Sequence, residues 1–190
     1  LGVGIAYRGY TRTSSVRSVA VIPFRNLTGD SENNYLCDGI SESLLTAISR
    51  DGDLKVIARG SSFRYNDETD PIDFGRKLDV ESVLVGAVTG NNGSFRISAR
   101  LLNTADGSVL WAGETSDLPA SNMLFLQDEI ARTVSGGLRE RTGKPVEYIR
   151  QTDNLDAYQN YLKGRYYWNL RTIESLNKSL EFYERAVALD

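Results

Sequence analysis

The stretch from Ser18 to Ser62 constrains the fold of this chain more than any other part. It contains an unbroken apolar run, Val19 to Ile22, and a second one, Leu54 to Ala58. Between them, apolar residues recur at helical spacing from about Tyr35 to Arg50, which predicts an amphipathic helix. Continuous apolar runs are typical of strands that are buried on both faces of a sheet. The stretch therefore predicts a strand–helix–strand unit on which the rest of an α/β domain is built.

A second helical crossover follows this unit. Asp70 and Pro71 are typical of a helix N-cap and of the first helical position, so we expect a short helix from Pro71 to Leu78. The chain then returns in a third apolar run, Ser82 to Val88. The order to this point is β-α-β-α-β.

The pattern then changes from crossover to meander. Asn91 to Ser94 is a hairpin signal, and apolar and polar residues alternate at strand period from Phe95 to Leu101. A turn at Ala105 to Gly107 leads to an expected strand at Val109 to Ala112. We expect an amphipathic helix from Met123 to Leu138 to cover the sheet. The predicted fold class is α/β: a mixed sheet built from β-α-β-α-β plus a β-meander and a closing helix, followed by an α-helical hairpin.

Two loops are the candidate small-ligand sites. The first loop is rich in turn formers and follows a buried strand. Open α/β sheets usually bind ligands at this position. The candidate ligand-binding residues of this loop are Asn26, Thr28 and Asp30. The second is a polar segment after the next strand, with Arg59, Ser61 and Ser62 as candidates. For both, the alternative is an ordinary connecting loop with capping side chains.

Three side chains of the first helix invite a chemical interpretation. Asp38 and Glu42 are one turn apart and imitate a catalytic carboxylate pair, but a solvated helix face is the better explanation. Cys37 lies at helical spacing with apolar neighbours, so we expect a small buried core residue and not a reactive thiol.

Three side chains of the meander have two interpretations each. Trp111 is either a binding aromatic or a core residue, and we favour the core because large aromatic side chains dominate buried area. Arg96 and Arg100 lie on the expected wet face of the sheet, where they are either solvated strand positions, which we favour, or an anionic site.

Composition excludes several classes of function. The chain has no histidine and a single cysteine, which removes the commonest general base and every Cys/His metal spacing. It has no phosphate loop and no nucleophile elbow, so we expect no enzyme, no metal site and no cofactor. The net charge of −3 argues against binding of nucleic acid, and no apolar run approaches the ~20 residues that span a bilayer.

The order VAVIPFRNLTGDSENNYLCDGISESLLTAISR, then LKVIARGSSFRY, then IDFGRKLDVESVLVGAV resembles the TolB-amino-terminal-like (FlgO-like) domain of bacterial transmembrane signalling proteins. The resemblance covers residues 18–138 and brings no catalytic residue with it. It implies a preceding membrane helix and, elsewhere in the protein, a winged-helix regulator of the CadC-like kind, a nucleotide cyclase or a protein kinase.

The last forty or so residues resemble a tetratricopeptide repeat (TPR), a pair of helices that stack side by side. We expect helices from Leu155 to about Leu170 and from Thr172 to Leu189. The resemblance assigns helix-packing roles to small and aromatic residues, namely Gly164, Tyr167, Ser179, Tyr183 and Ala186. Gly164 and Ala186 are further apart than in the usual repeat, which predicts a lengthened turn near Trp168 to Thr172.

The expected organisation is a juxtamembrane tail (1–17), an α/β domain (18–139), a linker (140–153) and the first TPR-like hairpin (154–190). The expected function is a non-catalytic sensory and interaction module of a bacterial membrane-anchored signalling or transcription-regulatory protein, which binds a protein or peptide through the TPR groove. The alternative is a small-ligand receptor that uses the two loops to regulate a linked output domain. Membrane association is expected only through a preceding helix, with the domain on the periplasmic side as the favoured placement, although three arginines after the apolar start argue for the cytoplasmic side.

Overall fold

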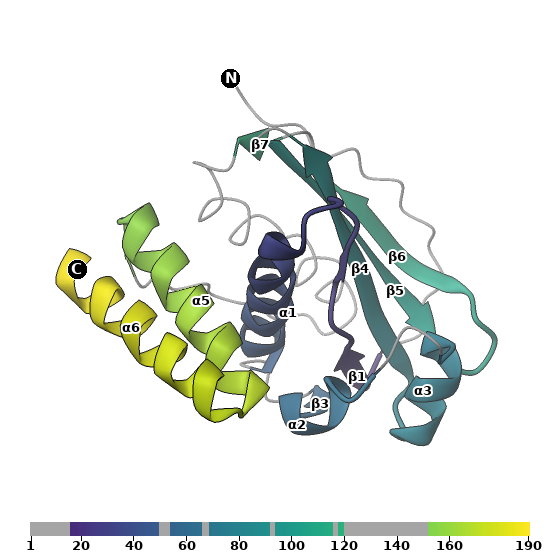
Figure 1. Ribbon diagram of the computed structural model, residues 1–190. Coiled ribbons are helices and arrows are strands. Elements are labelled where there is room, and N and C mark those ends of the chain that lie inside the picture. The colour runs from purple at the N-terminus through teal and green to yellow at the C-terminus, as the bar shows by residue number, and fades with distance from the viewer. Residues whose placement is uncertain (1–15, 50–53, 66–68, 92–93, 116–117, 120–151) are drawn as a thin grey trace.

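The computed structural model describes residues 16–49, 54–65, 69–91, 94–115, 118–119 and 152–190. Figure 1 shows a twisted sheet, the helix α1 packed on one face of it, and a hairpin of two long helices beyond α1. The helical elements are η1 (Ser31–Asn33), α1 (Asn34–Ser49), α2 (Arg59–Ser62), α3 (Pro71–Lys77), α5 (Leu155–Leu170) and α6 (Ile173–Leu189). The strands are β1 (Ser18–Val21), β2 (Arg25–Asn26), β3 (Lys55–Val56), β4 (Ser82–Asn91), β5 (Ser94–Asn103), β6 (Val109–Glu114) and β7 (Leu118–Pro119). The predicted class, a mixed sheet followed by a helical hairpin, is confirmed.

The sheet is mixed because its two halves are connected differently. Its main order is β3-β1-β4-β5-β6, with β2 paired to β4 and β7 paired to β5. β1 runs parallel to both β3 and β4, as helical crossovers require, whereas β4, β5 and β6 form an antiparallel meander. The long β4–β5 pair, in which Ser82 faces Asn103 and Asn91 faces Ser94, confirms the predicted hairpin.

The α1 side of the sheet carries the larger apolar core. Phe95, Ile97, Ala99 and Leu101 of β5 all point to this side and are buried, as the alternating pattern predicts. Trp111 is 8% exposed and joins the same cluster, so its assignment to the core is confirmed.

α1 closes this core with residues at helical spacing, among them Ile40, Leu44 and Ile48. Cys37 is buried beside them, as predicted, and burial raises the pKa of its thiol to about 12, with the neighbouring Asp38 adding to the rise. Ser41 Oγ accepts a hydrogen bond from the backbone N–H of Phe24 at 2.8 Å, which fixes α1 to the segment after β1.

The opposite side of the sheet is only partly covered. α3 begins as predicted: the Asp70 carboxylate accepts hydrogen bonds from the backbone N–H groups of Ile72 and Asp73. Phe74 and Leu78 are half-buried and pack against a small second core around Val83. The further part of this face, towards the β4–β5 turn, has no helix over it in the described chain.

Two local expectations are wrong, and a third lies outside the described residues. The segment from Arg59 to Ser62, expected to be a loop, forms the helical turn α2, in which the N–H of Phe63 bonds to the carbonyl of Arg59. The second strand is shorter than its apolar run, since only Lys55 and Val56 pair with β1. The predicted closing helix at 123–138 and most of the predicted linker lie outside the described residues.

The connection between α5 and α6 is also shorter than predicted. Only Arg171 and Thr172 separate the two helices, so the predicted lengthened turn is absent from the hairpin. Arg171 takes the left-handed conformation (φ 58°) that ends α5. Thr172 and Ser175 then exchange hydrogen bonds as a capping box and start α6.

Candidate functional site at the helical hairpin

The hairpin is built by close contact between α5 and α6. A Cβ atom on Gly164 would lie 2.7 Å from the Tyr183 ring, so glycine is needed for the two helices to approach. Tyr167 stacks on Phe182 with a centroid distance of 5.5 Å. At the open end, the Asn154 side chain donates to the carbonyl of Leu189 at 2.8 Å and ties the two helix termini together.

The other expected packing residues also lie in or near this contact. Ser179 is 1% exposed, whereas Ala186 is half-buried. Their positions are those of a two-helix hairpin, and assignment to a tetratricopeptide repeat stays a prediction.

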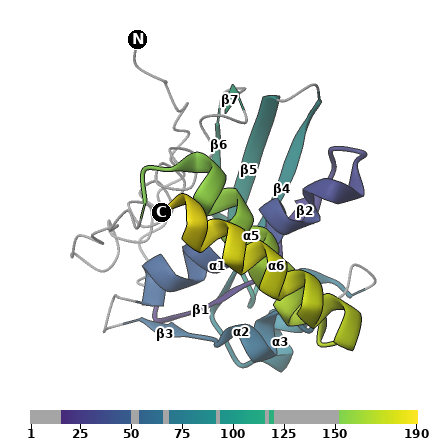
Figure 2. The ribbon, with the colours of Figure 1, turned by 60° about the vertical axis from the view of Figure 1, so that its left-hand side comes forward.

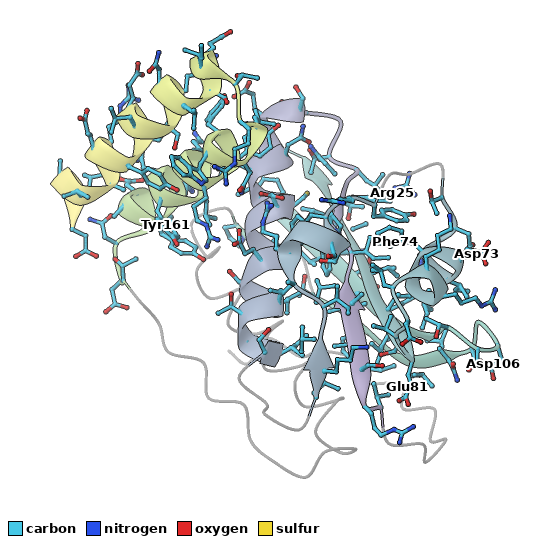
Figure 3. All side chains as sticks on the ribbon, turned by 90° about the horizontal axis from the view of Figure 1, so that it is seen from below. Arg25, Asp73, Phe74, Glu81, Asp106 and Tyr161 are labelled. Carbon is cyan, nitrogen blue, oxygen red and sulfur yellow. The ribbon has the colours of Figure 1, made fainter. Side chains whose placement is uncertain are left out.

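α5 packs directly on α1 of the α/β domain. Figures 1 and 2 show α5 between α1 and α6, so α6 forms the outer layer. Leu162 is 3% exposed. A Cβ atom on Gly39 of α1 would lie only 2.9 Å from the Leu162 side chain, so the two helices are in close contact there. Tyr158 is buried as well, packs with Tyr161 and approaches Ser43 of α1 with its hydroxyl at 3.4 Å. Tyr161 of α5, labelled in Figure 3, is partly buried and packs against Tyr158 and Leu162.

A cluster of four charged side chains lies in the same contact and joins three helices. The Nη2 atom of Arg59 on α2 lies 2.6 Å from Asp38 Oδ2. The Nε atom of the same side chain lies 3.3 Å from Glu42 Oε2. Arg165 of α5 forms an ion pair with the second oxygen of Glu42. Glu42 is only 12% exposed, so one carboxylate connects α1 to both α2 and α5. We call Asp38, Glu42, Arg59 and Arg165 the junction cluster.

Burial and charge act against each other within the junction cluster. Burial raises the pKa of Asp38, and the hydrogen-bonded Arg59 opposes the rise. Burial also lowers the pKa of Arg165. The Nε–H of Arg59 is near Glu42 but is not aligned for a hydrogen bond, and it has no other partner in the described chain. The cluster is thus held by paired charges that are largely removed from water.

The expectation of a solvated face for Asp38 and Glu42 is therefore wrong. Their partners come from α2 and from the far hairpin, so no local spacing could reveal the pairing. Helical periodicity assigned both residues to a face away from the sheet, and that face is covered by α5 instead of water. The sequence signal for the cluster is the one-turn spacing of the two carboxylates, which places them side by side on α1. Arg59 and Arg165 then pair with them from two other helices.

The first candidate ligand loop is occupied by its own hydrogen bonds. The Asn26 amide donates to the carbonyl of Asp30 at 2.8 Å and to Asn34 Oδ1 at 2.7 Å. Thr28 donates its hydroxyl proton to Asn26 Oδ1, and Asp30 caps the following turn by accepting from the N–H of Glu32. These contacts make it a structured connection into η1 and α1.

The second candidate group is divided. Arg59 belongs to the junction cluster, Ser61 is exposed, and Ser62 is buried with its hydroxyl near the carbonyl of Ala58. The structure thus brings Arg59 together with Asp38 and not with the Asn26 loop.

The outer face of the hairpin carries exposed apolar side chains. On α6, Ile173, Leu180 and Val187 are 83%, 59% and 79% exposed. They recur every seven residues, so they form one line along the helix, which we call the α6 stripe. Other exposed side chains of α6 are charged and form ion pairs along the helix. For example, Lys178 Nζ lies 3.1 Å from Glu174 Oε1. The α6 stripe is a surface that could take up another helix.

Neither a metal-ligand cluster nor a membrane-spanning helix is found among the described residues. Within them, no group of three acidic or cysteine side chains converges to hold a metal ion. Among the helices described here, none combines the length and apolarity that crossing a bilayer requires.

No protein-family model matches the chain. A curated protein of Rhizobium meliloti (strain 1021), named "Putative adenylate cyclase 3", is 41% identical over 152 residues, which is 78% of this chain and 26% of that protein. The chain thus spans about a quarter of the length of the relative it matches.

Several solved structures are similar at low identity. The PelC dodecamer from Paraburkholderia phytofirmans gives a TM-score of 0.47 at 17% identity, over 71% of this chain and 96% of that chain. TolB from Acinetobacter baumannii gives 0.49 at 15% identity, over 76% and 32% of the two chains. The LpoB C-terminal domain from Escherichia coli gives 0.46 at 18% identity, over 56% and 85%. TolB is thus among the similar structures, but likeness of this degree identifies no function for this chain.

Proposed function

We propose that this chain is a non-catalytic interaction module of a bacterial membrane-anchored signalling protein, and that it binds a protein partner through its helical hairpin. The observation that carries the proposal is the α6 stripe: three large apolar side chains face outward on a helix whose other side is firmly packed. Exposed apolar surface of this kind usually marks an interaction site. An amphipathic helix of the partner is the occupant that a seven-residue apolar repeat fits.

The α/β domain would serve as the platform in this arrangement. The junction cluster and Leu162 hold α5 against α1. A partner that binds α6 would therefore be held at a fixed position relative to the sheet. The hairpin would be a TPR-like unit, and the partner helix would cover the apolar face that one such unit cannot bury by itself.

The relative from Rhizobium meliloti supports a link to a cyclase. The matched region covers 26% of a protein named as an adenylate cyclase, so most of that protein lies outside the similarity. We propose that this region accompanies a cyclase output domain in a longer protein, and that it is anchored by a preceding helix with the domain on the periplasmic side. A DNA-binding or kinase output is the alternative that the sequence resemblance leaves.

The test is affinity purification of the full-length protein from the cells that encode it, in three forms. These are the wild type, Leu180→Gln, and Lys178→Gln as a matched control on the other side of α6. The proposal expects one protein to be recovered with the wild type and with Lys178→Gln but lost with Leu180→Gln. Recovery that is the same from all three forms contradicts it.

A further inference from the structure

A pocket of about 600 Å³ lies on the side of the sheet away from α1. It occupies the part of this face that α3 leaves uncovered. Its floor includes Val85 and Ala87 of β4 and Arg100 of β5, and its walls include Arg25, Tyr65 and Pro71. The volume is within the range of small-molecule sites, which are mostly apolar with a few convergent polar groups.

The register of the sheet places two arginines on either side of β4. Arg25 of β2 is paired with Ala87, and Arg100 of β5 is paired with Val85. Neighbouring strands are about 4.8 Å apart, so the two backbones are separated by roughly 10 Å across the sheet. Both residues line the pocket, and Arg25 extends on the side of the sheet that carries Phe74 and α3 (Figure 3). Two long cationic side chains thus border one cavity.

Among the described residues that line the pocket, Arg25 and Arg100 are basic and Asp70 is acidic. Arg100 forms no ion pair within the described part of the chain. Asp70 also lines the pocket, but its Oδ1 accepts from the backbone N–H groups at the start of α3. Guanidinium groups bind carboxylate and phosphate with strong, directional hydrogen bonds. The guanidinium of Arg100 therefore favours an anion in this pocket.

The remaining walls suit an apolar body. Val85 and Leu102 supply aliphatic surface, and Tyr65 supplies an aromatic wall that is held edge-on against Phe74 at 5.4 Å. We propose that this pocket binds a small organic anion, whose carboxylate or phosphate lies between Arg25 and Arg100 and whose apolar body packs on Val85, Leu102 and Tyr65. The site is on the opposite side of the sheet from the hairpin, so it is separate from the α6 stripe.

The test uses three probes with the same ring system: 2-naphthyl phosphate, 2-naphthoate and neutral 2-naphthol. Each is titrated into the purified chain by isothermal calorimetry. The proposal expects at least one anion to bind about tenfold or more tightly than 2-naphthol, because hydrogen bonds to charged groups are the strong ones. Preference for the phosphate or for the carboxylate identifies the head group.

Variants show where the probe binds. Arg100→Gln should weaken the anion at least about tenfold, and Ala87→Leu should weaken it by filling the floor without a change of charge. Arg185→Gln, at an exposed position on α6, is the matched control and should leave affinity unchanged. Equal affinity in Arg100→Gln and Arg185→Gln, or no binding of either anion at millimolar concentration, overturns the proposal. Unchanged melting temperatures show that the variants fold.

Discussion

Replacing Glu42 by Gln tests whether the junction cluster holds the hairpin to the α/β domain. The carboxylate pairs with Arg59 and with Arg165, and only 12% of its side chain is exposed. Removing one partner of a buried ion pair costs about 3–5 kcal/mol. Arg59 and Arg165 are 24% and 32% exposed and regain some hydration, and Asp38 still pairs with Arg59. We therefore expect the free energy of unfolding to fall by about 2 kcal/mol.

The assay is urea denaturation at pH 7, followed by tryptophan fluorescence. The two tryptophans report on different parts, Trp111 on the sheet and Trp168 on the hairpin, and variants with one of them replaced by Phe separate the signals. A double-mutant cycle with Arg165→Gln should give a coupling energy of about 1 kcal/mol or more. The exposed pair of Glu181 and Arg185 is the control, since Glu181→Gln should change stability by less than about 0.5 kcal/mol. A loss below about 0.5 kcal/mol for Glu42→Gln, or coupling near zero, refutes this reasoning.

Three further predictions address packing and titration. Leu162→Ala should lower the free energy of unfolding by about 2–3 kcal/mol in the same assay, whereas exposed Leu180→Ala should change it by less than about 0.5 kcal/mol; similar losses would contradict the docking of α5. Cys37 should react with a disulfide reagent at pH 8 about a thousandfold more slowly in the native state than in guanidinium, because burial raises its pKa to about 12; fast native labelling counts against this. The backbone N–H of Arg17 bonds to Glu81 at 2.8 Å and lowers the pKa of that carboxyl, with the Arg17 side chain adding to the effect. Glu81→Gln should therefore cost less than about 1 kcal/mol at pH 7, since the pair is exposed. The difference should shrink as pH falls below the ordinary Glu pKa of about 4.3 and vanish only below the lowered pKa of the folded state; a loss that persists at still lower pH contradicts the assignment.

The sequence predicted the order of the main elements because each has its own local pattern. The β5 strand alternates between buried Phe95 or Ile97 and exposed Arg96, and this period is visible without a structure. The start of α3 was equally predictable, because Asp70 and Pro71 act through neighbouring backbone groups. Features that depend on residues close in sequence were therefore within reach.

The junction cluster depends on contacts between distant segments and was not predicted. In the sequence, Asp38 and Glu42 have the pattern of a solvent-exposed helix face. In the fold, they form ion pairs with Arg59 and Arg165 of two other helices. The pocket arises likewise from strand register, which places Arg25 and Arg100 on opposite sides of β4. Periodicity gives the face of each strand but not which strands become neighbours, so such sites appear only in three dimensions.

Partner binding on the α6 stripe is the central claim, and site-specific photo-crosslinking tests it most directly. A benzoylphenylalanine is placed at Leu180 or, as control, at Lys178 in the full-length protein inside the cells that encode it. The two positions are similarly exposed, with 59% for Leu180 and 48% for the Lys178 side chain, but point to different sides of α6. We predict a discrete crosslinked protein from position 180 and none from position 178. No crosslink from position 180, or the same products from both positions, would contradict the claim.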